Sequence, residues 1–174
     1  MRAWLALGLI FLQFVLPLAA GAQVRAIEGG AAAGSGWMEL LEPPPEFPKP
    51  ENYLPFPVTA TTTFTFFVDA KSVSVGKDGV VRYSLIAKSA EGVLNVSFEG
   101  LRCSTREFRV YAYGRPDNSW SETRIANWQP IPRDMRNAQR AVLYRYYFCP
   151  GSDIIGNAEE GVRTLRRGPE QMSR

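Results

Sequence analysis

The feature that most constrains the fold is a series of short segments between residues 64 and 113 in which apolar and polar side chains alternate. Side chains on a β-strand point alternately to the two faces of a sheet, so this period of two predicts strands. Turn-forming residues separate the segments at 76–79, 90–92 and 114–117, and Asp78-Gly79 is a typical hairpin sequence. Connections this short join neighbouring strands, so the pattern predicts an antiparallel meander.

The alternation predicts a sheet of four to five strands. The segments are residues 64–69, 73–75, 81–88, 94–103 and 108–113. Along the fourth segment the apolar series slips at Gly100, after which Leu101 and Cys103 continue it. A β-bulge at Gly100 would account for this slip, because an extra residue exchanges the two faces of a strand.

Two C-terminal segments favour helix. Residues 138–148 (AQRAVLYRYYF) combine a helical beginning with a strand-like end, and we predict helix over the strand alternative. In the second segment Asn157 and Glu160 have the spacing of a capping box, arginines follow three to seven residues later, and Gly168-Pro169 ends the helix. Together with the strands, these helices predict an α+β fold: an antiparallel meander with one or two C-terminal helices.

The N-terminus resembles an export signal. Met1-Arg2 precedes an almost uninterrupted apolar run from Trp4 to Ala19, which ends in Ala20-Gly21-Ala22. The run is short for a membrane span, and the small residues suit a signal peptidase better than a retained anchor. We therefore expect cleavage before Gln23, a periplasmic location, and no stable membrane anchor after cleavage.

The sequence predicts four consecutive regions: a signal peptide (1–22), a flexible Gly/Ala/Pro-rich linker (23–46), a single α+β domain (47–150), and a C-terminal helix and tail (151–174). Seven prolines between residues 43 and 57 exclude helix there. Aromatic and aliphatic residues punctuate this stretch, so we expect it to lie across the domain as an extended strap.

The chain has two cysteines, Cys103 and Cys149. In an oxidising compartment two cysteines favour a single disulfide, which here would join residues 103 and 149. A redox-active pair is the alternative, but such pairs commonly lie close together in the sequence as C-x-x-C.

Histidine is absent, which removes imidazole bases, Cys-His nucleophile pairs and most nitrogen or sulfur metal sites. We therefore expect no cofactor and no metal, and assign no catalytic residue. Asp69 and Glu99 are the acids placed most firmly in predicted strands. A carboxylate pair can hydrolyse glycosidic bonds, so a small envelope hydrolase is the alternative function.

Basic residues are concentrated in the second half of the chain: residues 23–99 carry six basic and nine acidic side chains, and residues 100–174 carry thirteen and eight. Basic and aromatic residues alternate from Arg106 to Tyr113, as in some RNA-binding sheets, but the glycine of that motif is missing and export disfavours a nucleic-acid partner. Arginines and tyrosines grouped on one open sheet face would suit an envelope protein or glycan. This candidate binding face consists of Arg82, Arg109, Tyr111 and Tyr113.

Several longer sequence segments resemble those of a known protein family. Residues 66–103, with NVSFEGLRC as their most specific piece, and the downstream NWQPI and AVLYRYYFCP resemble the CNP-one-like family of small exported bacterial proteins. The resemblance covers roughly residues 47–150. It implies an exported protein of Gram-negative bacteria, and it agrees with a bridge between Cys103 and Cys149. The family is essentially uncharacterised and supplies no catalytic residues, so we expect a non-catalytic interaction or binding module of the cell envelope.

Overall fold

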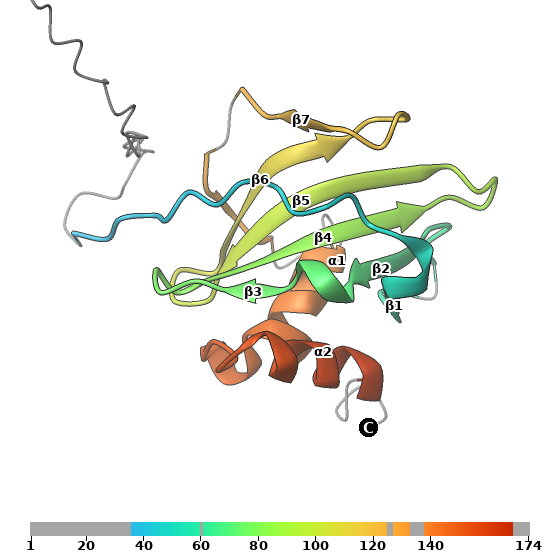
Figure 1. Cartoon of the computed structure of the whole chain (residues 1–174). Helices are drawn as coiled ribbons and strands as arrows, with labels where there is room; N and C mark the ends of the chain where they lie inside the picture. The colour runs from blue at the N-terminus through green and yellow to red at the C-terminus, as the bar shows by residue number, and fades with distance from the viewer. Residues whose placement is uncertain (1–35, 60, 125–126, 133–137, 169–174) are drawn as a thin grey trace, which may run out of the picture.

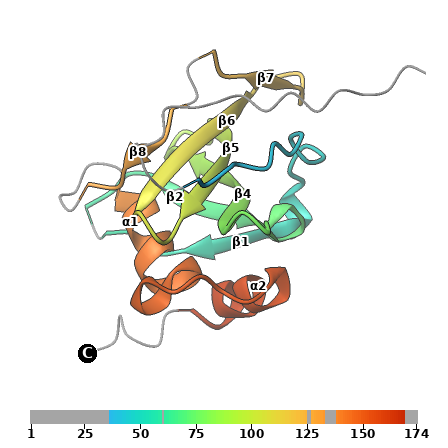
Figure 2. The same cartoon turned by 90° about the vertical axis from the view of Figure 1, so that its left-hand side faces the viewer.

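The structure is a computed structural model that describes residues 36–59, 61–124, 127–132 and 138–168. The expected signal peptide, its cleavage site before Gln23 and most of the expected linker lie outside these residues. An antiparallel sheet forms the middle of the fold, helices cover one face, and residues 36–49 cross the other face (Figures 1 and 2). We call residues 36–49 the strap.

In the described part of the chain, eight strands form the sheet, in the order β1-β2-β4-β5-β6-β7, with β3 paired to β4 and β8 paired to β6. The strands are β1 (Tyr53–Phe56), β2 (Thr65–Asp69), β3 (Ser74–Val75), β4 (Val80–Lys88), β5 (Leu94–Arg102), β6 (Glu107–Gly114), β7 (Trp120–Glu122) and β8 (Gln129–Pro130). The α+β meander is confirmed, whereas the predicted count of four to five strands is wrong. β1 escaped prediction because prolines surround it; Pro55 is tolerated there because β1 lies at an edge of the sheet.

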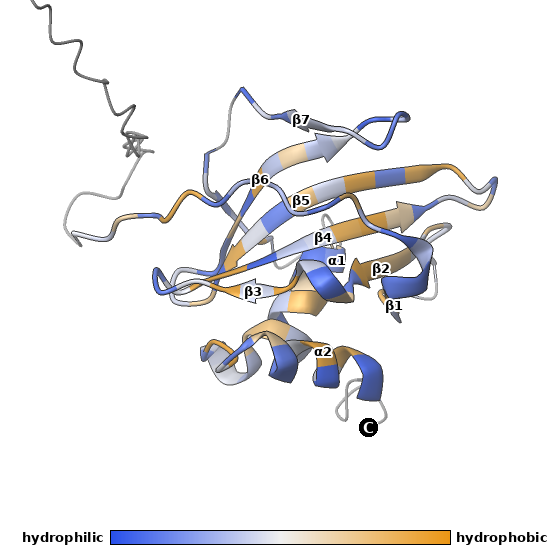
Figure 3. Ribbon diagram, viewed as in Figure 1, coloured by the Kyte–Doolittle hydropathy of each residue, from blue (hydrophilic) through white to orange (hydrophobic). Residues whose placement is uncertain are grey.

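The β-bulge lies in β6 and not at Gly100. Val110 pairs with Glu99 and Ala112 pairs with Phe98, which leaves Tyr111 as the extra residue. β5 is buried on both faces, so its apolar series continues from one face to the other without a bulge. Figure 3 shows apolar and polar residues mixed along the strands of the sheet. Gly100 has a different role, since a Cβ there would lie 2.5 Å from the Tyr111 hydroxyl oxygen.

The helical segments are η1 (Pro50–Asn52), η2 (Ala70–Ser72), α1 (Ala138–Val142), η3 (Leu143–Phe148), η4 (Pro150–Ser152) and α2 (Ala158–Arg167). The expectation of no helix between residues 43 and 57 is wrong at η1, a single 3-10 turn that accommodates Pro50 because Pro50 is its first residue. The helix predicted for residues 138–148 is confirmed, and its second half is a π-helix in which Cys149 N donates to Tyr144 O at 2.9 Å. The Asn157 side chain caps α2 by accepting from Glu160 N at 2.9 Å.

The core lies between the sheet and these helices. Tyr83 of β4 packs on Phe148 of η3 with ring centroids 5.2 Å apart, and Phe56 of β1 packs on Tyr147 at 6.0 Å. Gly161 allows α2 to come close to this core, because a Cβ there would lie 2.8 Å from Ile155 Cδ1. The disulfide between Cys103 and Cys149 is confirmed; it is buried and joins the end of the central sheet to the end of η3.

Candidate functional site

Three of the four residues of the candidate binding face come together on the strap side of the sheet. Arg82 of β4 and Arg109 of β6 flank Tyr111, and their guanidinium carbons lie 5.7 and 5.3 Å from its ring centroid. All three are covered by the strap, so this face is not open to solvent. Tyr113 is separate from them: it pairs with Ser97 on the helix side of the sheet and is 54% exposed.

Glu39 of the strap lies against the strap-side face of β6, where it meets three hydrogen-bond donors. Its carboxylate accepts from the Arg109 guanidinium, from the Tyr111 hydroxyl at 2.7 Å and from Trp128 Nε1 at 3.1 Å. Burial raises the pKa of Tyr111, and the neighbouring Glu39 charge raises it further against the opposing effect of Arg82, so the phenol stays protonated and donates. Three donors therefore hold one carboxylate, as a receptor holds an acidic ligand.

Arg82 holds a second part of the strap. Its guanidinium donates to Asp78 Oδ2 at 2.6 Å, to Glu42 Oε1 at 3.4 Å and to the Leu40 carbonyl oxygen. Asp78 in turn accepts from Leu40 N at 2.9 Å. Burial alone would raise the pKa of Asp78, but the hydrogen bonds from Arg82 and Leu40 outweigh burial and lower it. The turn residue Asp78 therefore remains a carboxylate that ties the strap to the sheet.

The strap turns Glu39, and in part Glu42, toward the sheet, whereas several of its apolar side chains point away from the sheet. Glu39 is buried, whereas Met38 is 77%, Leu40 46% and Leu41 42% exposed. Over residues 38–41 this arrangement reverses the usual one, in which apolar side chains face the protein and charged ones face water. We call Met38, Leu40 and Leu41 the outer strap surface.

Asp69 and Glu99, the acids of the alternative hydrolase, lie on opposite faces of the sheet. Glu99 faces the helices, where Arg140 binds both of its oxygens at 2.7 and 2.6 Å, and Ser97 and Tyr83 also donate to it. Asp69 faces the strap and lines a separate pocket. The two carboxylates therefore cannot act on one bond, and Glu99 is engaged in a structural ion pair.

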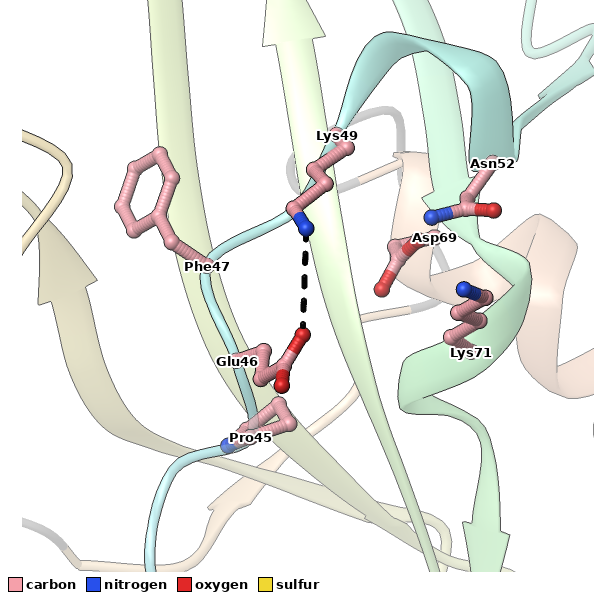
Figure 4. A pocket seen from close by; sticks show the side chains of 7 residues that line it. All are labelled: Pro45, Glu46, Phe47, Lys49, Asn52, Asp69 and Lys71. Atoms are coloured by element: carbon pink, nitrogen blue, oxygen red, sulfur yellow. Dashed lines mark ion pairs between the residues drawn. The ribbon is translucent and has the colours of Figure 1, made fainter.

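The Asp69 pocket lies between the strap and the end of β2, and Figure 4 shows its side chains. Its lining residues include Glu46, Lys49, Asn52, Asp69 and Lys71. Glu46 and Lys49, both exposed, form a long ion pair of 4.0 Å on its strap side. Asp69 is 3% exposed, and its Oδ1 has no hydrogen-bond partner among the described residues.

Neither a metal cluster nor a membrane span is found in the part of the chain that the structure describes. No three acidic or cysteine side chains gather there in a way that could bind a metal ion, and no helix there has the length and apolar character to cross a bilayer.

Sequence reasoning did not find the strap acids Glu39 and Glu42 as partners of the arginines. The charge distribution could have indicated this pairing, because residues 23–99 have an excess of acidic side chains and residues 100–174 an excess of arginines. Lys49, Asn52 and Lys71 gave no such signal, since their meeting around Asp69 depends on the path of the strap.

Comparison with known proteins agrees with the sequence resemblance. The model of the CNP1-like family matches residues 32–166. This chain belongs to the CNP1-like family. A curated relative, Cryptic neisserial protein 1 of Neisseria gonorrhoeae (strain ATCC 700825 / FA 1090), is 33% identical over 97 residues, which cover 48% of this chain and 47% of the relative. The chain thus matches about half the length of that relative. No solved structure matches the chain significantly.

The range matched by the CNP1-like family begins before the strap and ends within α2. Both the strap and the helix that packs on the core therefore belong to the part that this chain shares with its CNP1-like relatives. The family itself is uncharacterised, so an account of function has to come from the chemistry of this chain.

Proposed function

We propose that this CNP1-like protein is exported to the periplasm and works there as a non-catalytic interaction module of the cell envelope. The observation that carries the proposal is the strap at residues 38–41, where the sheet binds Glu39 while Met38, Leu40 and Leu41 face solvent. Exposed apolar side chains that lie together commonly mark a contact with another protein.

The buried disulfide and the N-terminal sequence support export. Disulfides persist in oxidising compartments and are rare in a reducing cytosol. The bond between Cys103 and Cys149 is therefore expected of a chain whose first 22 residues read as a signal peptide.

The buried charged side chains form ion pairs with one another, which supports a non-catalytic role. Glu99 is bound by Arg140, and Arg82 and Arg109 are bound by strap and turn carboxylates. These groups stabilise the fold and are not free to transfer protons to a substrate. The outer strap surface has aliphatic side chains without aromatic rings, which suits an apolar protein surface better than a glycan.

Export is tested by intact-mass measurement on protein isolated from the periplasm of a Gram-negative host that expresses the full chain. We expect an N-terminus at Gln23 and a mass two hydrogens below that of the reduced chain, because the signal is removed and the two thiols are oxidised. A chain that keeps Met1 and two free thiols would refute the export part of the proposal.

The interaction surface is tested by crosslinking and pulldown from envelope extracts with three forms of the mature protein. These are the wild type, a variant with serine at Met38, Leu40 and Leu41, and a control with serine at Val93 and Leu94. The control residues are also exposed, at 60% and 45%, but belong to the β4–β5 hairpin.

We expect an envelope protein to be recovered with the wild type and the hairpin control, and at least tenfold less of it with the strap variant. Equal recovery with all three forms would rule out the outer strap surface, and recovery of no partner by the wild type would argue against an interaction module.

A further inference from the structure

The Asp69 pocket has the dimensions of a small-molecule site. Its volume is about 340 Å³, at the lower end of the range found for ligand pockets. The end of β2 forms its floor, and strap and η1 residues form one wall. Figure 4 shows the polar ends of Asp69, Asn52 and Lys71 directed toward one another, with Glu46 and Lys49 on the strap side.

One carboxylate oxygen of Asp69, at the floor of this pocket, lacks a donor. Asp69 is 3% exposed, yet its Oδ1 accepts no hydrogen bond from the described residues. Burial raises the pKa of Asp69 and outweighs the backbone hydrogen bonds from Lys71 and Ser72 that lower it. A buried acceptor without a donor is destabilising, so a ligand that donates to Oδ1 would gain more than the same contact gives at the surface.

The charges around the pocket are balanced. Asp69 and Glu46 are acidic, and Lys49 and Lys71 are basic. A purely anionic ligand would be repelled by Asp69, and a purely cationic one would be repelled by Lys71 and Lys49. A ligand with one charge of each sign can place each charge next to a side chain of the opposite sign.

The pocket does not offer an aromatic face to a sugar. Phe47 lines it, but the ring of Phe47 packs on Trp120 with centroids 5.1 Å apart and turns away from the polar groups in Figure 4. Sugar rings are commonly bound by stacking on such a face, so the arrangement favours a small charged ligand.

We propose that this pocket binds a zwitterionic amino compound, an amino acid or a short peptide, with its ammonium group on Asp69 and its carboxylate between Lys71 and Lys49. The site is separate from the outer strap surface and does not depend on the function proposed for it. Binding is non-covalent and reversible, and the strap contributes Lys49 and Glu46 to it.

Glycylglycine is a suitable probe, because it carries both charges and little else. We expect saturable amide shifts at residues 46–52 and 69–72 when glycylglycine is added to the ¹⁵N-labelled mature protein at neutral pH. N-acetylglycylglycine lacks the ammonium group and glycylglycinamide lacks the carboxylate, so each should bind at least tenfold more weakly. Binding should also weaken as the pH falls through the raised pKa of Asp69, since protonation removes the charge that attracts the ammonium group.

Asp69→Asn keeps the shape and should weaken glycylglycine binding at least tenfold, whereas the control Asp153→Asn, at an exposed acid, should leave it unchanged. Absence of saturable shifts with glycylglycine would overturn the proposal. Equal binding of the acetylated probe, or unchanged binding by Asp69→Asn in a protein whose amide spectrum is otherwise preserved, would also overturn it.

Discussion

Glu99→Ala is expected to lower the free energy of unfolding by about 3–5 kcal/mol, because it breaks a buried ion pair with Arg140 next to the core. Glu99 is fully buried and accepts four hydrogen bonds, two of them from Arg140 at 2.7 and 2.6 Å. The Arg140 guanidinium also stacks on Phe108, with 4.2 Å between its carbon and the ring centroid. Alanine would remove the acceptor and leave a cation and two hydroxyl groups, those of Ser97 and Tyr83, without that acceptor. Denaturant unfolding followed by circular dichroism measures the loss.

Two further variants distinguish the stability lost with the ion pair from the stability lost by shortening a side chain. Glu107→Ala removes a partly exposed partner of Arg102, 3.8 Å away, and should change the free energy of unfolding by less than about 1 kcal/mol. Replacing the pair together, with Glu99→Leu and Arg140→Met, should recover much of the stability, because neither charge of this pair is then buried without the other. The interpretation fails if Glu99→Ala is no more destabilising than Glu107→Ala.

The sequence predicted the parts of the fold whose signals are local. Alternation over residues 81–88 and 108–113 marked two central strands, and the spacing of Asn157 and Glu160 marked the start of α2. Alternation reports only that successive side chains face opposite ways. It could not show that both faces of β5 are covered, so the change of face near Gly100 was misread as a bulge.

The candidate site depends on contacts between distant segments. Arg82, Arg109 and Tyr111 were expected on an open face, and the structure covers them with the strap that carries Glu39. Glu39 lies 70 residues from Arg109 in the sequence, in a stretch expected to be a linker. Pairing over such a separation is fixed by the path of the chain, which no local pattern encodes. Asp78 was identified as a turn residue, and only the structure shows that its carboxylate also binds Arg82 and Leu40 N.

Removal of the disulfide is the second change for which we expect a large effect. Cys103 and Cys149 are separated by 46 residues and are both buried, with Cα atoms 5.5 Å apart. Closing a loop of this length restricts the unfolded chain, so the double replacement Cys103→Ala and Cys149→Ala should lower the free energy of unfolding by about 2–5 kcal/mol. For a domain of this size, the middle of that range corresponds to a fall in Tm of roughly 10 °C. Alanine is preferable to serine here because it does not bury a hydroxyl group.

Reduction of the wild type provides the matched control. A thiol reductant should lower the Tm of the wild type by nearly as much as the double replacement does, and it should not change the Tm of the Cys103→Ala and Cys149→Ala variant. The reductant leaves every side chain except the two sulfurs unchanged, so agreement between the two measurements assigns the loss to the covalent link. If the wild type melts at the same temperature with and without reductant, the link does not stabilise this fold. The sheet and η3 would then be held together by non-covalent contacts, among them the packing of Tyr83 on Phe148 and of Phe56 on Tyr147.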